Sequence, residues 1–298
     1  MSLKEYASFA IPSVVEIEEG KGGLPVVRVS NDFAEAEMYL YGAHVTRFDP
    51  KGAKPLLWMS PASPFTAGKP IRGGIPLCFP WFGPHRISKD FPMHGFARIR
   101  PFELSYTARL SDGRTRVGMV QRSDDASRLW WPHDYNLEVT ATFGKALEES
   151  MTVTNIGREP FSYEDCMHTY FAVSDAPNAT VLGLDGVGYM DRLAGDALGV
   201  QSGGLTIGGG LTKIFTQSPR SVRIENIAGG RTLLAEQEGM ANTVVWNPGK
   251  ETAAGNPELA GREKEFLCVE AANCVNSPVT LLPGCSHTST VRYSAEKK

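Results

Sequence analysis

The sequence has no long apolar run and no excess of positive charge. None of its segments approaches the run of about 20 apolar residues that a membrane-spanning helix needs. Lysine and arginine number 30 against 33 acidic residues, which gives a formal net charge of -3. A chain without a broad basic surface is not expected to bind nucleic acid or a charged membrane. Any anionic ligand has to be held by a few placed cations.

Paired cysteines are missing as well. The chain has five cysteines, Cys78, Cys166, Cys268, Cys274 and Cys285. Because their number is odd and no two are spaced as CxxC, the sequence predicts neither a disulfide framework nor a metal site. Unpaired cysteines suit a reducing compartment. Charges early in the chain and Pro12 interrupt the first apolar run, unlike in a secretory signal. We therefore expect a cytoplasmic protein.

Helical periodicity is scarce. The one short helix that the sequence predicts lies within "GNPELAGREKEF", residues 255–266. The glycine-rich run "SGGLTIGGG" lacks the lysine and hydroxyl residue that end a phosphate loop, so we interpret it as a turn between strands. No βαβ alternation and no dinucleotide-binding fingerprint is present, and we expect no cofactor.

Strand patterns dominate the chain. Turn signals such as Asp112-Gly113 and Asp185-Gly186 separate runs that alternate or are rich in β-branched residues. These runs cover residues 35–48, 102–110, 116–122, 135–143, 149–155, 162–173, 221–226, 242–247, 266–273 and 289–295. Short strands with frequent turns predict an all-β fold, a large antiparallel β-sandwich. No linker or repeat divides the chain, so residues 1–298 are expected to form a single domain.

One predicted strand carries a histidine. Alternation places Glu164, Cys166, His168 and Tyr170 on one face of it. A histidine among aromatic and apolar neighbours is either a buried side chain bonded to a carbonyl or an acid–base group, because its pKa lies near neutral pH. The residue type alone leaves both interpretations open.

Another predicted strand, "FLCVEAAN", carries a glutamate. Alternation places Glu270 on one face with Phe266, Cys268 and Ala272. Burying an unpaired carboxylate is costly, so Glu270 must be paired, protonated or directed into a cleft. It is therefore either half of a structural salt bridge with an arginine or a base whose pKa is set by its surroundings.

The segment "IRGGIPLCFPWFGPHRISKDFPMHGFAR", residues 71–98, combines a stiff backbone with polar ends. Arg72 and Arg98 stand at its two ends and His94 lies near the second. Arginine forks match the oxygens of a carboxylate or phosphate, and the prolines and glycines would keep the loop in one shape. If the loop folds back, both arginines hold an anion; otherwise they are structural salt-bridge residues. His94 either binds substrate or caps the loop. The aromatic residues of the loop, Phe79, Trp81 and Phe82, either pack the loop against the core or form a wall on which a sugar stacks.

Five motifs, in order, carry a resemblance to a known family. "IRGGIPLCFPWFG", "MHGFAR", "CMHTYF", "VVWNPG" and "FLCVEAAN" resemble the glucose-6-phosphate 1-epimerase branch of the aldose 1-epimerase family, from about Phe33 to Tyr293. The resemblance implies a galactose-mutarotase-like β-sandwich. It also implies interconversion of the α and β anomers of a hexose 6-phosphate, with D-glucose 6-phosphate as the expected substrate. Gly249 and Met93 depart from the family's pattern and bear on the finer sugar preference.

The resemblance also assigns roles to single residues. Catalysis falls on His168 and Glu270, and this chemistry needs one acid and one base but no metal or redox cofactor. In the expected reaction, ionised Glu270 takes the proton of the C1 hydroxyl. His168 then gives a proton to the ring oxygen.

Substrate binding is assigned in the same way. The arginines that recognise phosphate fall on Arg72 and Arg98, and the loop histidine that lines the pocket falls on His94. The aspartate that contacts the sugar falls on Asp191, with Asp185 as the neighbouring alternative.

Three other functions remain open at this stage. A non-catalytic sugar-phosphate-binding or sensor protein would not need His168 and Glu270. An epimerase for unphosphorylated aldoses would not need two placed arginines. A glycoside hydrolase would need a second carboxylate, such as Asp165 or Asp191, opposite Glu270. The oligomeric state is not predicted, and a monomer is compatible with each function.

Overall fold

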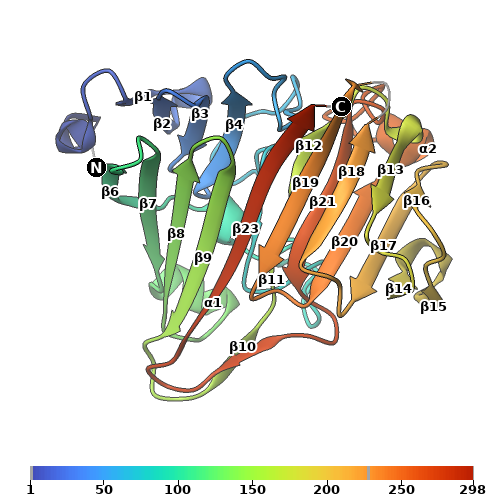
Figure 1. Cartoon of the computed structure of the whole chain (residues 1–298). Coiled ribbons are helices and arrows are strands. Elements are labelled where there is room, and N and C mark those ends of the chain that lie inside the picture. Colours follow the sequence, from blue (N-terminus) through green and yellow to red (C-terminus); the bar gives the residue numbers. More distant parts are fainter. Residues whose placement is uncertain (1–2, 227–228, 298) are drawn as a thin grey trace.

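The computed structural model describes residues 3–226 and 229–297, and most of its regular structure is β. Two large sheets lie one behind the other along the molecule, and a smaller sheet near the N-terminus lies beside them (Figure 1). The paired strands of the described residues run antiparallel within every sheet. The predicted antiparallel β-sandwich is therefore confirmed.

The larger sheet has nine strands in the order β16-β13-β18-β19-β23-β9-β8-β7-β6. Its strands are β6 Glu103–Arg109, β7 Thr115–Arg122, β8 Tyr135–Phe143, β9 Leu147–Asn155, β13 Ala179–Leu182, β16 Leu205–Thr206, β18 Ser221–Asn226, β19 Arg231–Glu238 and β23 Ser286–Lys297.

The second sheet has eight strands in the order β15-β14-β17-β20-β21-β11-β5, with β12 also paired to β21. Its strands are β5 Leu77–Cys78, β11 Asp165–Met167, β12 Tyr170–Ala172, β14 Gly188–Asp191, β15 Ala197–Val200, β17 Leu211–Thr216, β20 Asn242–Asn247 and β21 Phe266–Asn273.

The remaining elements are short. The four-stranded sheet contains β1 Val15–Glu19, β2 Pro25–Ser30, β3 Ala34–Tyr39 and β4 His44–Pro50, and a two-stranded ribbon joins β10 Phe161–Tyr163 to β22 Val279–Leu281. The helices are α1 Asp125–Trp130 and α2 Gly249–Ala254, with 3-10 turns η1 Leu3–Phe9, η2 Lys21–Gly23, η3 Ala97–Ile99, η4 Ala176–Asn178 and η5 Arg192–Ala194. No helix among these described elements is long and apolar enough to cross a membrane.

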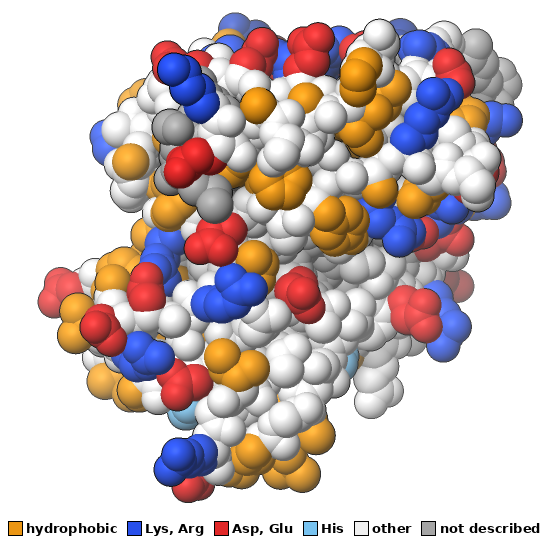
Figure 2. Space-filling model, turned by 90° about the vertical axis from the view of Figure 1, so that its left-hand side faces the viewer, with side chains coloured by type: hydrophobic (Ala, Val, Ile, Leu, Met, Phe, Trp, Pro, Cys, Tyr) orange, Lys and Arg blue, Asp and Glu red, His pale blue; other side chains and the backbone are white. Residues whose placement is uncertain are grey.

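The main core lies between the two large sheets. It draws buried side chains from both of them, among them Leu137, Val153, Leu233, Val291, Val245, Leu267 and Val269. Removing this apolar surface from water contributes about 25 cal/mol per Å² to folding. The surface outside the core carries scattered charges of both signs, as one face in Figure 2 shows, in keeping with the small net charge.

Alternation along β21 divides its side chains between two environments. Leu267, Val269 and Ala271 belong to the main core, whereas Cys268 belongs to a separate cluster on the other face. Glu270 shares the face of Cys268, because side chains two apart in a strand point the same way. Glu270 therefore points away from the sandwich interior, toward the face that segment 71–98 covers.

Most predicted strands are confirmed, and the helix prediction was wrong. Residues 255–265 form successive turns instead, and the short helix α2 ends just before them. The Asn256 side chain accepts a hydrogen bond from the Glu258 backbone N–H at 2.9 Å, a local turn that competes with a helix. Pro257 has no N–H to contribute to a helical ladder. Helix α1 was not predicted.

Candidate active site

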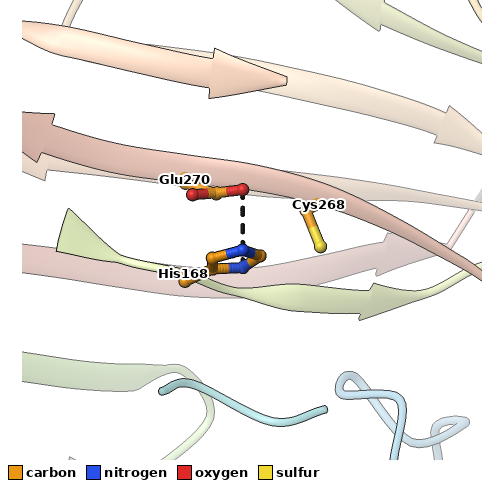
Figure 3. A group of neighbouring side chains, drawn as sticks. All are labelled: His168, Cys268 and Glu270. Carbon is orange, nitrogen blue, oxygen red and sulfur yellow. Dashed lines mark ion pairs between the residues drawn. The ribbon is translucent and has the colours of Figure 1, made fainter. Parts of the chain in front are cut away.

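His168 directly follows strand β11, Glu270 lies in the adjacent strand β21, and their side chains meet. Strand β11 pairs with β21 through Met167 and Ala271. His168 follows Met167 and Glu270 precedes Ala271, so the antiparallel register brings the two residues opposite each other. The His168 Nδ1 atom is 3.4 Å from the Glu270 Oε1 atom, the contact drawn in Figure 3. The structure therefore brings together the two residues that separate motifs had marked as catalytic.

Burial sets the charge preference of this pair. His168 is 7% exposed and Glu270 is 1% exposed. Burial lowers the pKa of His168 well below its usual value, and the nearby His94, Arg98 and Arg72 lower it further. Burial raises the pKa of Glu270 well above its usual value, and the neighbouring Cys78 adds to this effect. The pair therefore favours its neutral forms, unlike the ionised pair expected from the sequence.

Neighbouring side chains fix the orientation of both groups. The Cys166 thiol donates to the Glu270 Oε2 atom at 3.2 Å, which leaves Oε1 for His168. The His168 ring stacks on Tyr170 with a centroid distance of 4.9 Å and an interplanar angle of 11°. The edge of Trp246 meets the same ring at 5.7 Å. The imidazole is thus held between two aromatic rings and cannot turn freely.

Arg72 reaches this site by way of Tyr170. Its Nη1 atom donates to the Tyr170 hydroxyl at 3.1 Å, and its Nε atom donates to the Glu258 carboxylate at 3.2 Å. Burial opposes the charge of Arg72, but Tyr170 and Glu258 outweigh burial and raise its pKa. Arg72 therefore keeps its charge and a fixed position next to Tyr170, which stacks on His168.

Arg98 is buried with much less compensation. It is 7% exposed, its Nη2 atom donates to the Met93 carbonyl at 2.8 Å, and its Nε atom has no hydrogen-bond partner. Among residues 3–226 and 229–297 no carboxylate forms an ion pair with it. Burial lowers the pKa of the guanidinium, and the charge of Arg72 lowers it further. A guanidinium stays charged even so. Among the described residues this cation therefore has no carboxylate partner, and the main balancing group is the thiol of Cys78, whose pKa His94 and Arg98 help to lower.

The loop before Arg98 places His94 beside His168. The rings of His94 and His168 meet edge to face at 5.7 Å. The His94 Nδ1 atom accepts the Gly83 backbone N–H at 3.1 Å, so the neutral ring carries its proton on Nε2. His94 has a φ of 63°, a left-handed conformation that non-glycine residues seldom adopt. Gly95 follows with φ of 73°, where a Cβ would lie 2.0 Å from the Phe79 carbonyl oxygen.

The aromatic residues of the loop divide between the two predicted roles. Phe79 and Trp81 are buried in the main core and pack the loop down. Phe82 remains half-buried and contacts His94 with a centroid distance of 4.9 Å. The Glu164 carboxylate accepts the Phe82 backbone N–H at 3.0 Å and the Val275 backbone N–H at 3.0 Å, which fixes this part of the loop.

The predicted sugar-binding aspartates lie farther from this pair. Strand register places Asp191 opposite Lys213, and Lys213 in turn opposite Val245, a residue of the main core. Asp191 is thus in a row that faces away from Glu270, and its carboxylate accepts the Leu193 backbone N–H at 3.0 Å. The alternative, Asp185, is exposed in a turn.

A second carboxylate for glycoside hydrolysis is not provided by Asp165. This residue is fully buried and accepts hydrogen bonds from Asn273 and from Ser289 of the opposite sheet. Burial raises its pKa to about 6. Asp165 therefore points into the sandwich, away from Glu270, and connects the two sheets.

Metal-ligating atoms meet at one place in the described residues. One ligand atom each from His168, Cys268 and Glu270 lie within 4.8 Å of one another, and all three side chains are buried (Figure 3). This group could not be predicted from the sequence, because no two of these residues are spaced as a metal-binding motif. Tyr170 and Trp246 were also missed as site residues, although alternation had already placed Tyr170 on the face of His168.

The arrangement defines a class of protein: an antiparallel β-sandwich with a buried histidine–glutamate pair and two arginines near it. The sequence matches the aldose 1-epimerase family over residues 25–294. A relative from Cenchrus ciliaris named "Putative glucose-6-phosphate 1-epimerase" is 32% identical over 273 residues, which cover 87% of this chain and 81% of the relative.

Solved structures agree with this match. The crystal structure of "a putative mutarotase (YeaD)" from Salmonella typhimurium has a TM-score of 0.90 at 26% identity and covers 97% of this chain and 96% of that chain. A galactose mutarotase-like protein from Clostridium acetobutylicum has a TM-score of 0.73 at 16% identity, over 95% of this chain and 98% of that chain, and shares the fold.

This chain belongs to the aldose 1-epimerase family. It is an isomerase of the mutarotase type, with a galactose-mutarotase-like fold.

Proposed function

We propose that the protein interconverts the α and β anomers of a hexose 6-phosphate, with D-glucose 6-phosphate as the main substrate. The observation that carries this proposal is Arg98, a buried guanidinium without a carboxylate partner beside the acid–base pair. A neutral sugar has no group that compensates this charge, whereas a phosphate does. The name of the Cenchrus ciliaris relative supports the same substrate.

The reaction requires one proton to leave the C1 hydroxyl and another to reach the ring oxygen. When the ring opens, the C1 aldehyde can rotate, and reclosure on its other face gives the other anomer. Glu270 removes the hydroxyl proton and His168 donates to the ring oxygen, and reclosure reverses both transfers. General acid–base help of this kind is worth about 10²–10⁴-fold.

Substrate binding converts the neutral pair into its working form. The pair shares one titratable proton, which burial places on Glu270. A C1 hydroxyl that donates to Glu270 stabilises the carboxylate, and a ring oxygen that accepts from His168 stabilises the imidazolium. The proton therefore moves to His168 as the sugar binds, and the total charge of the pair does not change.

The phosphate does not react, so its role is to position the sugar. Arg72 is already held by Tyr170 and Glu258, and Arg98 is held by the loop backbone. Both cations are therefore in place before the substrate arrives, which reduces the entropy cost of binding. Anchoring the remote phosphate places C1 against the acid and base.

Two further assignments belong to this proposal. A contact of Asp191 with the sugar stays a prediction, which Asp191→Ala tests through KM for the phosphosugar. The described cysteines are free, and four of them are buried, which fits the reducing cytoplasm that we propose as the compartment.

Magnetisation-transfer NMR on the wild-type protein tests the substrate. Anomer exchange is measured for glucose 6-phosphate, mannose 6-phosphate, glucose and galactose at equal concentration. The proposal expects faster exchange for the phosphosugars, with glucose 6-phosphate the fastest. Greater acceleration of glucose or galactose would show an epimerase for unphosphorylated aldoses, and no acceleration of any sugar would show a binding protein.

A further inference from the structure

Cys268 lies beside the catalytic pair, but the proposed reaction does not use it. Its Sγ atom, a nitrogen of His168 and a carboxylate oxygen of Glu270 are all within 4.8 Å of one another (Figure 3). Cys268 is fully buried, and its strand partner in β20 is Trp246, which also contacts His168. The thiol thus lies on the same face of the sheet as the acid and the base, close to both.

We propose that His168, Cys268 and Glu270 form a site for a soft divalent metal, and that Zn²⁺ bound there blocks the pocket. Thiolate, imidazole and carboxylate are the donors that Zn²⁺ takes in proteins. The Cys268 thiol and the Glu270 carboxyl group each release a proton to water as their bonds to zinc form, so the two anions formed balance the charge of the ion. Binding does not depend on the proposed function, whereas inhibition rests on it.

The distances need little adjustment for a tetrahedral ion. Zinc bonds of about 2.0–2.3 Å place neighbouring ligand atoms about 3.3–3.6 Å apart. The His168 Nδ1 atom and the Glu270 Oε1 atom are already 3.4 Å apart. Because all three groups lie within 4.8 Å, the remaining approach is about 1 Å, within the reach of small side-chain rotations.

The surroundings leave these donors available. The Nδ1 atom of His168 is buried without a hydrogen-bond partner. The thiol of Cys166 holds the other oxygen of Glu270, as outer partners of metal ligands commonly do. Two anionic ligands, from Cys268 and Glu270, balance the charge of Zn²⁺. The cations Arg72 and Arg98 oppose a metal ion, so we expect an inhibitory site of moderate affinity rather than a permanent one.

A metal at this position excludes the reaction. His168 and Glu270 cannot hold the ion and transfer protons at the same time. Zn²⁺ and the sugar therefore compete for the same two side chains, and inhibition is expected to be competitive with the phosphosugar.

Cobalt(II) spectroscopy tests the site without relying on activity. Titration of the wild-type protein with Co²⁺, in a buffer without chelating groups, is expected to give a near-ultraviolet thiolate-to-cobalt charge-transfer band. Cys268→Ser removes the thiolate and is expected to abolish the band. Cys285→Ser is the matched control, since Cys285 is the exposed cysteine of the described chain, and it is expected to leave the band unchanged.

Inhibition is measured separately, by the effect of Zn²⁺ on glucose 6-phosphate anomer exchange. Loss of a hydrogen bond to a metal-binding side chain lowers the affinity for the metal about 10–100-fold. Loss of a metal-binding side chain itself should therefore lower it at least about 100-fold. We therefore expect the half-inhibitory Zn²⁺ concentration to rise at least about 100-fold in Cys268→Ser, relative to its own uninhibited rate. Cys268→Ala provides a second variant if the serine is not tolerated in this apolar environment.

The outcomes separate the site from the proposed function. Absence of the cobalt band in the wild-type protein, or a band that persists in both Cys268 variants, would overturn the site. A band with no zinc inhibition of a catalytically active protein would overturn the blocking role. If the protein accelerates no anomer exchange at all, the proposed function fails, and the cobalt band alone still decides whether the metal site exists.

Discussion

Replacing Arg98 should separate stability from function. Arg98→Met keeps most of the aliphatic side chain and removes the guanidinium. In the free protein that group has a single hydrogen bond, to the Met93 carbonyl, and a buried Nε without a partner. In the complex it would form charge-assisted hydrogen bonds to the phosphate. The variant is thus expected to be a weaker enzyme and an equally or more stable protein.

The expected loss follows from those hydrogen bonds. A hydrogen bond to a charged group contributes about 1.5–3 kcal/mol, and each 1.4 kcal/mol corresponds to a factor of ten. The value of kcat/KM for glucose 6-phosphate should therefore fall about 10–150-fold in Arg98→Met. Free glucose makes no contact with this charge, so its exchange rate should change much less than that of glucose 6-phosphate, and only through the effect of Arg98 on the pKa values of His168 and Glu270.

The expected stability change has the opposite sign. An unsatisfied buried polar group costs about 1–3 kcal/mol, and somewhat more when it is charged. Part of that cost is recovered when the cation is removed, so the melting temperature of the free protein should rise by about 2–6 °C. Differential scanning calorimetry without ligand measures the stability, and magnetisation-transfer NMR on both sugars measures the activity. Equal losses on glucose and glucose 6-phosphate, or a lower melting temperature, would refute the anchoring role of Arg98.

Other side chains give further tests. Glu149 is buried without a hydrogen-bond partner and burial raises its pKa well above its usual value, so its folded form binds the proton more tightly than the unfolded chain. Stability from this group is complete below the unfolded pKa of about 4.3 and is lost as pH rises toward the folded pKa. Glu149→Gln should therefore be more stable than the wild-type protein at pH 7 but not at pH 4, as urea unfolding at both pH values would show; an equal difference at both would exclude this linkage. Tyr170→Phe keeps the ring against His168 but removes the acceptor for Arg72. Because Arg72 is charged, this hydrogen bond is worth about 1.5–3 kcal/mol, which predicts a loss of about 10–150-fold in kcat/KM for glucose 6-phosphate. Unchanged glucose exchange in steady-state assays would separate this effect from misfolding.

Strand periodicity predicted much of the fold and the directions of the key side chains. The segment "FLCVEAAN" is strand β21 with its predicted bounds, and Glu270 and Cys268 share a face as the alternation required. The segment containing His168 instead divides into the short strands β10, β11 and β12. Alternation still placed His168 and Tyr170 on one face, because side-chain direction depends on local backbone geometry.

Long-range partners could not be predicted in this way. Glu258, which pairs with Arg72, is 186 residues away in the sequence, and Cys166 meets Glu270 across 104 residues. The protonation states of His168 and Glu270 could not be predicted either, because their pKa values depend on burial by segments far away in the sequence. The helix prediction failed because Asn256 forms a side-chain turn that competes with helical hydrogen bonds.

The central claim is that His168 and Glu270 form the acid–base pair for anomer exchange. The most direct measurement is magnetisation-transfer NMR on saturating glucose 6-phosphate with the wild-type protein, His168→Ala and Glu270→Gln, after circular dichroism has shown that all three are folded. The account predicts that each variant loses about 10²–10⁴-fold of the enzyme-catalysed exchange rate. A folded His168→Ala or Glu270→Gln variant that retains more than a tenth of the wild-type rate would contradict it.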